Sequence, residues 1–297
     1  HHVLNYGDVL ESMVIRPFVE EYSRGRTPNP CVGCNRYLKF GRLFNDAAAL
    51  GGTHLATGHY AGNVLNAATG AYELRRARDP RKDQSYFLYD VPRARLPQLF
   101  FPLGAYTKDE VRALARRFGL PVAEKKDSQD ICFIPGGKYQ DVLALRLGGQ
   151  GRPGNFVDQD GRVVGEHKGI WRYTVGQREG LGIALGVPVY VNRIDAASNT
   201  VHVGPEEKLF SVGLEASGLN WLGPNILQET IEATFKIRYN HNDVGGRVTM
   251  LDGGGIRVRF SQPQKAVAPG QSVVIYDGDL VLGGAVIDRA IQPTEGI

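Results

Sequence analysis

The chain has 297 residues, of which 42% are apolar and 22% charged, and its formal net charge is +4. These values are ordinary for globular proteins of two or three domains, and they exclude a disordered or collagen-like chain. No apolar run approaches the ~18 residues of a membrane-spanning helix, and the first residues lack a signal-peptide pattern. The composition therefore predicts a globular protein that makes no membrane contact.

Charge and glycine are distributed unevenly along the chain. Residues 1–135 hold 19 lysines and arginines against 14 aspartates and glutamates, but only 11 of the 38 glycines. This basic excess favours contact with a polyanion, and a solvated surface explains it equally well. The glycine-rich remainder predicts many tight turns between short strands.

The first 135 residues predict alternating helices and strands, as in an α/β layer with a largely parallel sheet. Thr107 and Glu110 have the spacing of a capping box at a helix start. Pro17 marks a kink or the start of a second helix. The predicted elements are helices over 8–24, 36–50 and 108–118, strands over 53–57 and 72–74, a loop over 25–30, and a strand or short helix over 85–91.

After about residue 136 the pattern changes to short strands separated by turn signals such as DGGG and YDGD. This pattern is typical of small β-barrels or sandwiches. Asn220 and Trp221 mark a candidate join between two β-rich modules. The predicted strands are 189–194, 200–205, 231–239, 246–251, 255–260, 272–278 and 284–288.

The cysteines are too few for a disulfide framework. Cys31 and Cys34 form a C-x-x-C in a proline-rich loop, and Cys132 lies far along the chain. An odd count without a secretory signal favours a reducing compartment. No second C-x-x-C or zinc-spaced histidine pair accompanies them, which argues against a closed zinc site. Inert thiols, a sulfur-handling pair and three ligands of an iron–sulfur cluster stay open as alternatives.

Six longer motifs occur along the chain from about residue 4. They are TPNPCVGCNRYLKFG, ATGHYA, KDQSYFLY, KKDSQDICFI, GEHKGIWRYTVGQREGLGI and PGQSVVIYDGD. Together, and in this order, they resemble the tRNA-specific 2-thiouridylase family. The resemblance implies an α/β domain of the adenine-nucleotide alpha-hydrolase type, with a parallel sheet and only partly present, over residues 1–135. Two small β-rich domains follow over 136–212 and 213–297, the last a β-barrel.

The resemblance also implies a reaction. ATP, with Mg²⁺, adenylates the C2 oxygen of the wobble uridine in tRNA, and a cysteine persulfide then supplies sulfur. Cys34 matches the family's catalytic cysteine and Cys132 its persulfide carrier, and a second cysteine resolves a persulfide by thiol–disulfide exchange. The target base has to leave its stack. The implied partners are tRNA and a persulfide-donating carrier or cysteine desulfurase, in the bacterial cytoplasm or, in a eukaryote, the mitochondrion.

Further residues match binding positions of the family. Gly58 matches a nucleotide-contacting glycine at a strand end, where ligands bind in open α/β sheets. Five cations within residues 75–82 favour phosphate binding. Structural roles are the alternative for each residue. The residues that match tRNA-contacting positions are Asn29, Pro30, Cys31, His59, Lys82, Asp83, Gln84, Arg238, Tyr239 and Gln271.

Cys31 departs from the family pattern, because some relatives carry aspartate there. Related tRNA thiolases hold a [4Fe-4S] cluster with three cysteines and one open iron. Cys31, Cys34 and Cys132 as ligands of such a cluster are therefore an alternative to the persulfide, with Cys31 as a spectator in the persulfide case.

The family's SGG-x-DS loop, which binds ATP phosphates, does not occur in the sequence. The GGTH at 51–54 lacks its serine and aspartate. We therefore expect that the chain starts inside the catalytic domain, as a fragment or a degenerate protein, and that alone it does not hydrolyse ATP productively. A non-catalytic tRNA-binding remnant and a zinc or redox domain built on the C-x-x-C are the alternative functions.

Overall fold

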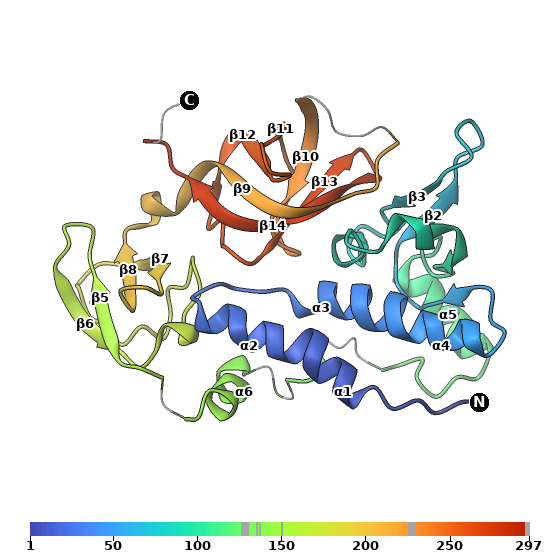
Figure 1. Ribbon diagram of the computed structural model, residues 1–297, viewed down its shortest axis with the longest axis horizontal. Coiled ribbons are helices and arrows are strands. Elements are labelled where there is room, and N and C mark those ends of the chain that lie inside the picture. The colour runs from blue at the N-terminus through green and yellow to red at the C-terminus, as the bar shows by residue number, and fades with distance from the viewer. Residues whose placement is uncertain (126–130, 135, 137, 150, 225–229, 295–297) are drawn as a thin grey trace.

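The computed structural model describes residues 1–297 except 126–130, 135, 137, 150, 225–229 and 295–297. Figure 1 shows two long helical rods that lie below a β-barrel, with a smaller sheet at one end and a mixed helix–strand region at the other. Among the described residues, no helix has the length and apolar character needed to cross a bilayer.

The first helical rod consists of α1 (Gly7–Leu10), the π-helical η1 (Glu11–Ile15) and α2 (Arg16–Ser23). It corresponds to the helix predicted over residues 8–24. Pro17 lies in the first turn of α2, where a missing N–H is tolerated. Phe18 and Tyr22 turn inward from this rod and are almost fully buried.

The second rod consists of α3 (Pro30–Gly33), the π-helical η2 (Cys34–Leu43) and α4 (Phe44–Ala49). The expectation that this helix begins at residue 36 was wrong. Asn29 caps the helix by accepting a hydrogen bond from the Cys31 N–H at 3.2 Å, and Pro30 takes the first helical position. Asparagine and proline are standard start signals there. The C-x-x-C therefore lies in the first turn of a helix and not in a loop.

The α/β region pairs β1 (Leu55–Ala56) in parallel with β4 (Leu99–Phe100), which confirms a parallel sheet. β2 (Gly62–Leu65) and β3 (Tyr72–Arg75) form an antiparallel hairpin, and β3 also pairs with the barrel. The short helix alternative for residues 85–91 is the correct one, because Ser85–Phe87 form the 3-10 turn η3.

Two further helical elements complete this region. The 3-10 helix η4 (Arg93–Gln98) precedes β4, and α5 (Lys108–Arg117) follows it. The predicted capping box at α5 is confirmed, because the Thr107 side chain accepts from the Glu110 N–H while the Glu110 carboxylate accepts from the Thr107 N–H.

The middle of the chain forms a small four-stranded sheet in the order β6-β5-β8-β7. Its core contains Phe156, Val191 and Val201, all fully buried. Its elements are α6 (Tyr139–Arg146), β5 (Gly154–Val157), β6 (Val163–His167), the 3-10 turn η5 (Ile170–Arg172), β7 (Tyr190–Asp195) and β8 (Thr200–Gly204).

The C-terminal part forms the predicted β-barrel. Six antiparallel strands follow the order β13-β10-β11-β12-β9-β14, and a β13–β14 pairing closes the barrel. The elements are the 3-10 turn η6 (Glu206–Leu209), β9 (Phe210–Trp221), β10 (Ile231–Lys236), β11 (Val244–Met250), β12 (Ile256–Lys265), β13 (Ser272–Asp277) and β14 (Leu280–Ile291). The join expected at Asn220 and Trp221 was wrong, because both residues end β9 and pair with β14.

The barrel and the α/β region share one hydrophobic core. Phe40 and Tyr86 from the α/β region cluster with Val274 and Tyr276 from the barrel, and all four are fully buried. The Tyr86 hydroxyl donates to the Ser272 carbonyl oxygen at 3.0 Å. Because apolar surface is buried between the two parts, the barrel packs firmly against the second helical rod, to which Phe40 belongs.

Candidate active site

Three free thiols come together from two segments of the chain. Cys31 and Cys34 are half-buried in the first turn of the second rod, and Cys132 is exposed. The segment around Cys132 is anchored because Phe133 packs edge-on against Phe18, with 5.5 Å between ring centroids. The thiols are close enough that Cys34 and Cys132 both raise the pKa of Cys31.

Burial controls the protonation of these thiols. It raises the pKa of Cys31 to about 11, so this thiol stays protonated at neutral pH. Burial also raises the pKa of Cys34, and the ammonium group of Lys39 opposes that rise. A thiolate is the reactive form of cysteine, so Lys39 is the group that favours the reactive form of Cys34.

Lys39 is held by a histidine at the end of β1. Its Nζ lies 3.3 Å from His59 Nε2, and His59 Nδ1 lies 2.7 Å from the Thr57 hydroxyl oxygen. Burial and the Lys39 charge lower the pKa of His59 to about 4. An ammonium group can only donate, so the neutral ring accepts at Nε2 and donates from Nδ1.

This depressed pKa makes stability depend on pH. The unfolded chain takes up a proton on His59 below pH 6.5, whereas the folded protein does so only near pH 4. Stability is therefore lost as pH falls through that window. Between pH 7 and 5 we expect the wild type to lose about 2 kcal/mol more unfolding free energy than His59→Gln. Urea titrations at both pH values check this, and equal losses would contradict it.

The iron–sulfur and zinc alternatives both concern these same three cysteines. Within the described part of the chain, which includes all three cysteines, no group of three or more His, Cys, Asp or Glu side chains is placed to hold a metal ion. A zinc site needs such a group, whereas the cysteines of a [4Fe-4S] cluster each bind a different iron atom. The described residues give no positive support to either alternative.

Gly58 lies at the carboxyl end of β1, exposed and directly before His59. Ligands of open α/β sheets bind at this edge. A Cβ on Gly58 would meet only Leu103 Cδ1 within 4 Å, at an ordinary distance of 3.7 Å. Packing alone therefore does not require glycine here, and close approach of a ligand to the backbone is consistent with it.

The basic run at 75–82 is largely paired with carboxylates. Arg75 Nη2 lies 2.5 Å from Glu73 Oε2, and Arg76 Nη2 lies 2.5 Å from Asp243 Oδ2. Arg81 differs because its side chain is 73% exposed, although its Nε lies 3.4 Å from a carboxylate oxygen of Asp79. Exposed ion pairs contribute little energy, so a phosphate group can compete for Arg81 more easily than for Arg76.

Removing the exposed charge of Arg81 should therefore change the salt dependence of tRNA binding. For Arg81→Ala, we expect the slope of log K against log salt to fall by about 0.7 to 0.9, the value for one lost phosphate contact. Arg76→Ala, which removes a paired charge, is the matched control and should leave the slope unchanged. Filter-binding titrations measure both slopes, and equal slopes in all proteins would show that Arg81 does not contact RNA.

Asp83 and Gln84 use their side chains within the protein. The Asp83 carboxylate is buried and accepts from the Ala77 N–H at 3.0 Å and the Ser85 hydroxyl at 2.8 Å. Gln84 Oε1 accepts from the Tyr60 N–H at 2.9 Å. These bonds fix the chain beside His59, and tRNA contacts of Lys82, Asp83 and Gln84 stay predictions.

The predicted tRNA-binding residues of the barrel also make internal contacts. Arg238 Nη2 donates to the Val175 carbonyl oxygen at 2.9 Å, and burial lowers the pKa of its guanidinium. The Tyr239 ring packs on Phe87 with 4.5 Å between centroids. Gln271 Nε2 donates to the Thr27 carbonyl oxygen at 2.7 Å, close in sequence to Asn29. Their contacts with tRNA stay predictions.

Lys39 is the main residue that the sequence analysis missed. It lies five residues after Cys34 on the same rod. A sequence signal was available, because Asn29-Pro30 as a helix start places Cys34 and Lys39 in one helix. The contact with His59 had no such signal, since it joins a helix to a strand end.

Three family models together match most of the chain. The model described as the tRNA methyl transferase HUP domain matches residues 1–136, the tRNA methyl transferase PRC-barrel domain matches 140–205, and the aminomethyltransferase beta-barrel domain matches 211–287. The fold and the cysteine site thus define a HUP-domain protein with two appended β domains.

Individual relatives narrow this class. The tRNA-specific 2-thiouridylase MnmA of Geobacter metallireducens is 50% identical over 99% of this chain and 79% of its own length. The MnmA proteins of Geotalea uraniireducens and Carboxydothermus hydrogenoformans are 48% and 47% identical over 98% of the chain, and the matches cover 77% and 80% of those relatives. The chain belongs to the MnmA family of tRNA-specific 2-thiouridylases.

Proposed function

We propose that this protein is a tRNA sulfurtransferase that replaces the C2 oxygen of the wobble uridine with sulfur at the expense of ATP. The observation that most directly supports the proposal is that Cys34 lies close to both Cys132 and Lys39. The chain that holds them belongs to the MnmA family. Gly58 at the nearby sheet edge is the proposed nucleotide contact. ATP supplies the adenylyl group that makes the C2 oxygen a leaving group, and Mg²⁺ enters with its phosphates.

The two cysteines take different roles in this proposal. Cys132 is exposed and receives a terminal sulfur atom from a persulfide-donating protein. That sulfur attacks the activated C2 carbon, and AMP leaves with the oxygen. The Cys34 thiolate then attacks Cys132 Sγ and breaks the sulfur–sulfur bond. The new sulfur stays on the base, the two cysteines are joined in a disulfide, and an external thiol reductant restores them.

The remaining assignments follow from the same reaction. Asn29 caps the helix that carries the C-x-x-C, and we propose that Asn29, Pro30 and Cys31 contact the extracted base beside Cys34. His59 is proposed to contribute to tRNA binding by keeping the Lys39 side chain in position. We propose domain limits of 1–135, 136–212 and 213–297, supported by family-model matches over 1–136, 140–205 and 211–287. We also propose a bacterial cytoplasmic location, because the relatives named above are bacterial.

A thiolation assay tests the proposal. The product of the whole gene is incubated with ATP, a persulfide donor and unmodified tRNA, and the tRNA nucleosides are analysed by mass spectrometry. We expect 2-thiouridine that depends on both ATP and the donor. Tight tRNA binding without any 2-thiouridine would instead support the non-catalytic remnant.

A further inference from the structure

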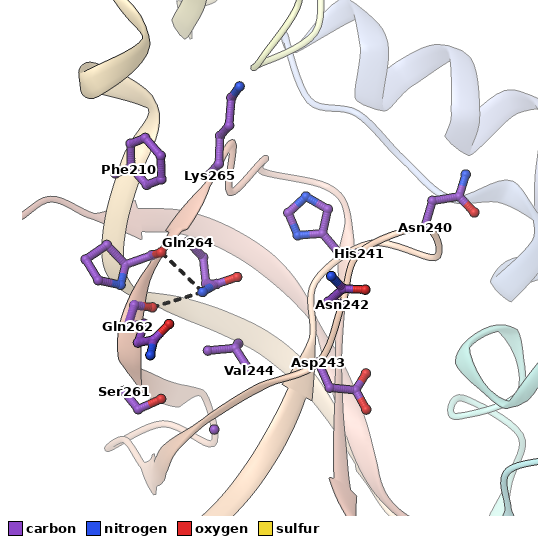
Figure 2. A pocket seen from close by; sticks show the side chains of 12 residues that line it. Phe210, Asn240, His241, Asn242, Asp243, Val244, Ser261, Gln262, Gln264 and Lys265 are labelled. Carbon is purple, nitrogen blue, oxygen red and sulfur yellow. Dashed lines mark hydrogen bonds between the residues drawn. The ribbon is translucent and has the colours of Figure 1, made fainter. Parts of the chain in front are cut away.

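A polar pocket of about 600 Å³ lies on the barrel, outside the cysteine site. Figure 2 shows it between the turn that precedes β11 and the end of β12, with Phe210 at its edge. Its lining residues come from three chain segments, and half of them have uncharged polar side chains. They are Asn240, His241, Asn242, Asp243, Val244, Gly245, Ser261, Gln262, Pro263, Gln264, Lys265 and Phe210.

An irregularity in β12 builds one wall of the pocket. Arg259 pairs with Gly213 of β9, whereas Gln264 pairs with Ser211. β12 therefore advances five residues while β9 advances two, and the extra residues of β12 form a bulge. Gln264 Nε2 fixes the bulge by donating to the carbonyl oxygens of Gln262 and Pro263 at 3.0 and 3.2 Å. Bulges of this kind re-aim side chains and occur often beside functional sites.

The pocket presents hydrogen-bonding groups that the protein itself does not use. Asn240, Asn242, Ser261 and Gln262 are exposed, and their side chains make no hydrogen bond to another described residue. His241 points into the gap in Figure 2. Burial, with the charges of Arg238 and Lys236, lowers the pKa of His241, so its neutral ring offers one donor and one acceptor.

The charged residues of the pocket are already paired. Asp243 forms an ion pair with Arg76 at 2.5 Å, and Lys265 forms one with Glu206. The pocket is therefore rich in amides and has no strong net charge. Amide side chains both donate and accept hydrogen bonds, so they match nucleobase edges and ribose hydroxyls. Phosphate groups instead bind mainly cationic side chains.

The pocket lies next to two residues with predicted tRNA contacts, Arg238 and Tyr239, which also make internal contacts. The next three residues along the chain, 240–242, line the pocket and carry unused polar groups. We propose that this pocket binds an unpaired nucleoside of the tRNA through the side chains of Asn242, Gln262 and His241. This inference rests on the proposed function. Unpaired RNA bases are recognised in this way, by hydrogen bonds to their edges and stacking on neighbouring rings.

The test is tRNA binding by the double variant Asn242→Ala, Gln262→Ala across a range of salt concentrations. We expect Kd to rise about ten-fold, from the loss of base-edge hydrogen bonds, with an unchanged slope of log K against log salt, because no phosphate contact is lost. The matched control is Asn155→Ala, an exposed amide on β5. It should bind like the wild type.

Each outcome either supports or overturns the proposed nucleoside pocket. An unchanged Kd in the double variant, with tight binding by the wild type, overturns the pocket and leaves the proposed function standing. A fall in the salt slope shows a phosphate contact and also overturns it. A wild type that binds no tRNA overturns both proposals. Thermal unfolding of the variants at the wild-type temperature verifies that the changes are local.

Discussion

Serine in place of Cys34 or Cys132 is expected to lower tRNA thiolation by at least about three orders of magnitude, the scale seen when a nucleophile is removed. The hydroxyl group can neither carry a terminal sulfur nor attack a disulfide bond at neutral pH. Affinity for tRNA should stay within a few-fold, because neither thiol belongs to the hydrophobic core. Thiolation by the product of the whole gene and filter binding measure the two quantities.

Cys31→Ser is the matched control for this pair. It makes the same substitution within the same helical turn, at a thiol whose pKa of about 11 keeps it protonated. We expect it to retain thiolation. Near wild-type activity in Cys34→Ser or Cys132→Ser would refute the persulfide roles. Loss of activity in Cys31→Ser with the fold intact would favour a function that needs all three thiols.

Tyr86→Ala is expected to lower the free energy of unfolding by about 4 kcal/mol, in the range measured for large aromatic side chains removed from cores. Tyr86 is fully buried in the core that the α/β region shares with the barrel. Its hydroxyl also bonds to the carbonyl oxygen of Ser272. Chemical denaturation followed by fluorescence and circular dichroism measures the change.

Tyr86→Phe separates packing from hydrogen bonding. It keeps the ring and removes one hydrogen bond, so we expect a loss of about 1 kcal/mol. A barrel that unfolds in a separate transition, with a midpoint insensitive to Tyr86→Ala, would show that the two parts do not depend on a common core.

Local signals in the sequence were sufficient for much of the fold. The capping box of Thr107 and Glu110 defines the start of α5. Gly51, with φ of 89°, and the bond from the Gly52 N–H to the Ala47 carbonyl oxygen end the second rod as expected. The start of that rod was misplaced, because two prolines in GRTPNP indicate a loop unless Asn29 is recognised as a cap. β5 and β6 were missed, since they have few regularly alternating apolar residues.

Nonlocal contacts explain what the sequence could not predict about the site. Asp83 and Arg238 are ionisable residues of a type that usually lies on the surface, yet Asp83 makes a buried hydrogen bond and Arg238 a part-buried one within the protein. Closure of the barrel requires β13 and β14 to pair on both sides, and no short pattern encodes that pairing. The C-x-x-C and Cys132 were found because their motifs are long, whereas the contact of Lys39 with His59 depends on how the rod packs on β1.

The most direct measurement is the oxidation state of the cysteines after one turnover without reductant. The product of the whole gene, preloaded with persulfide, is mixed with ATP and tRNA, alkylated and mapped by mass spectrometry. The proposed mechanism predicts one Cys34–Cys132 disulfide for each 2-thiouridine formed, with Cys31 alkylated as a free thiol. Thiolated tRNA together with free thiols at both Cys34 and Cys132 would contradict it.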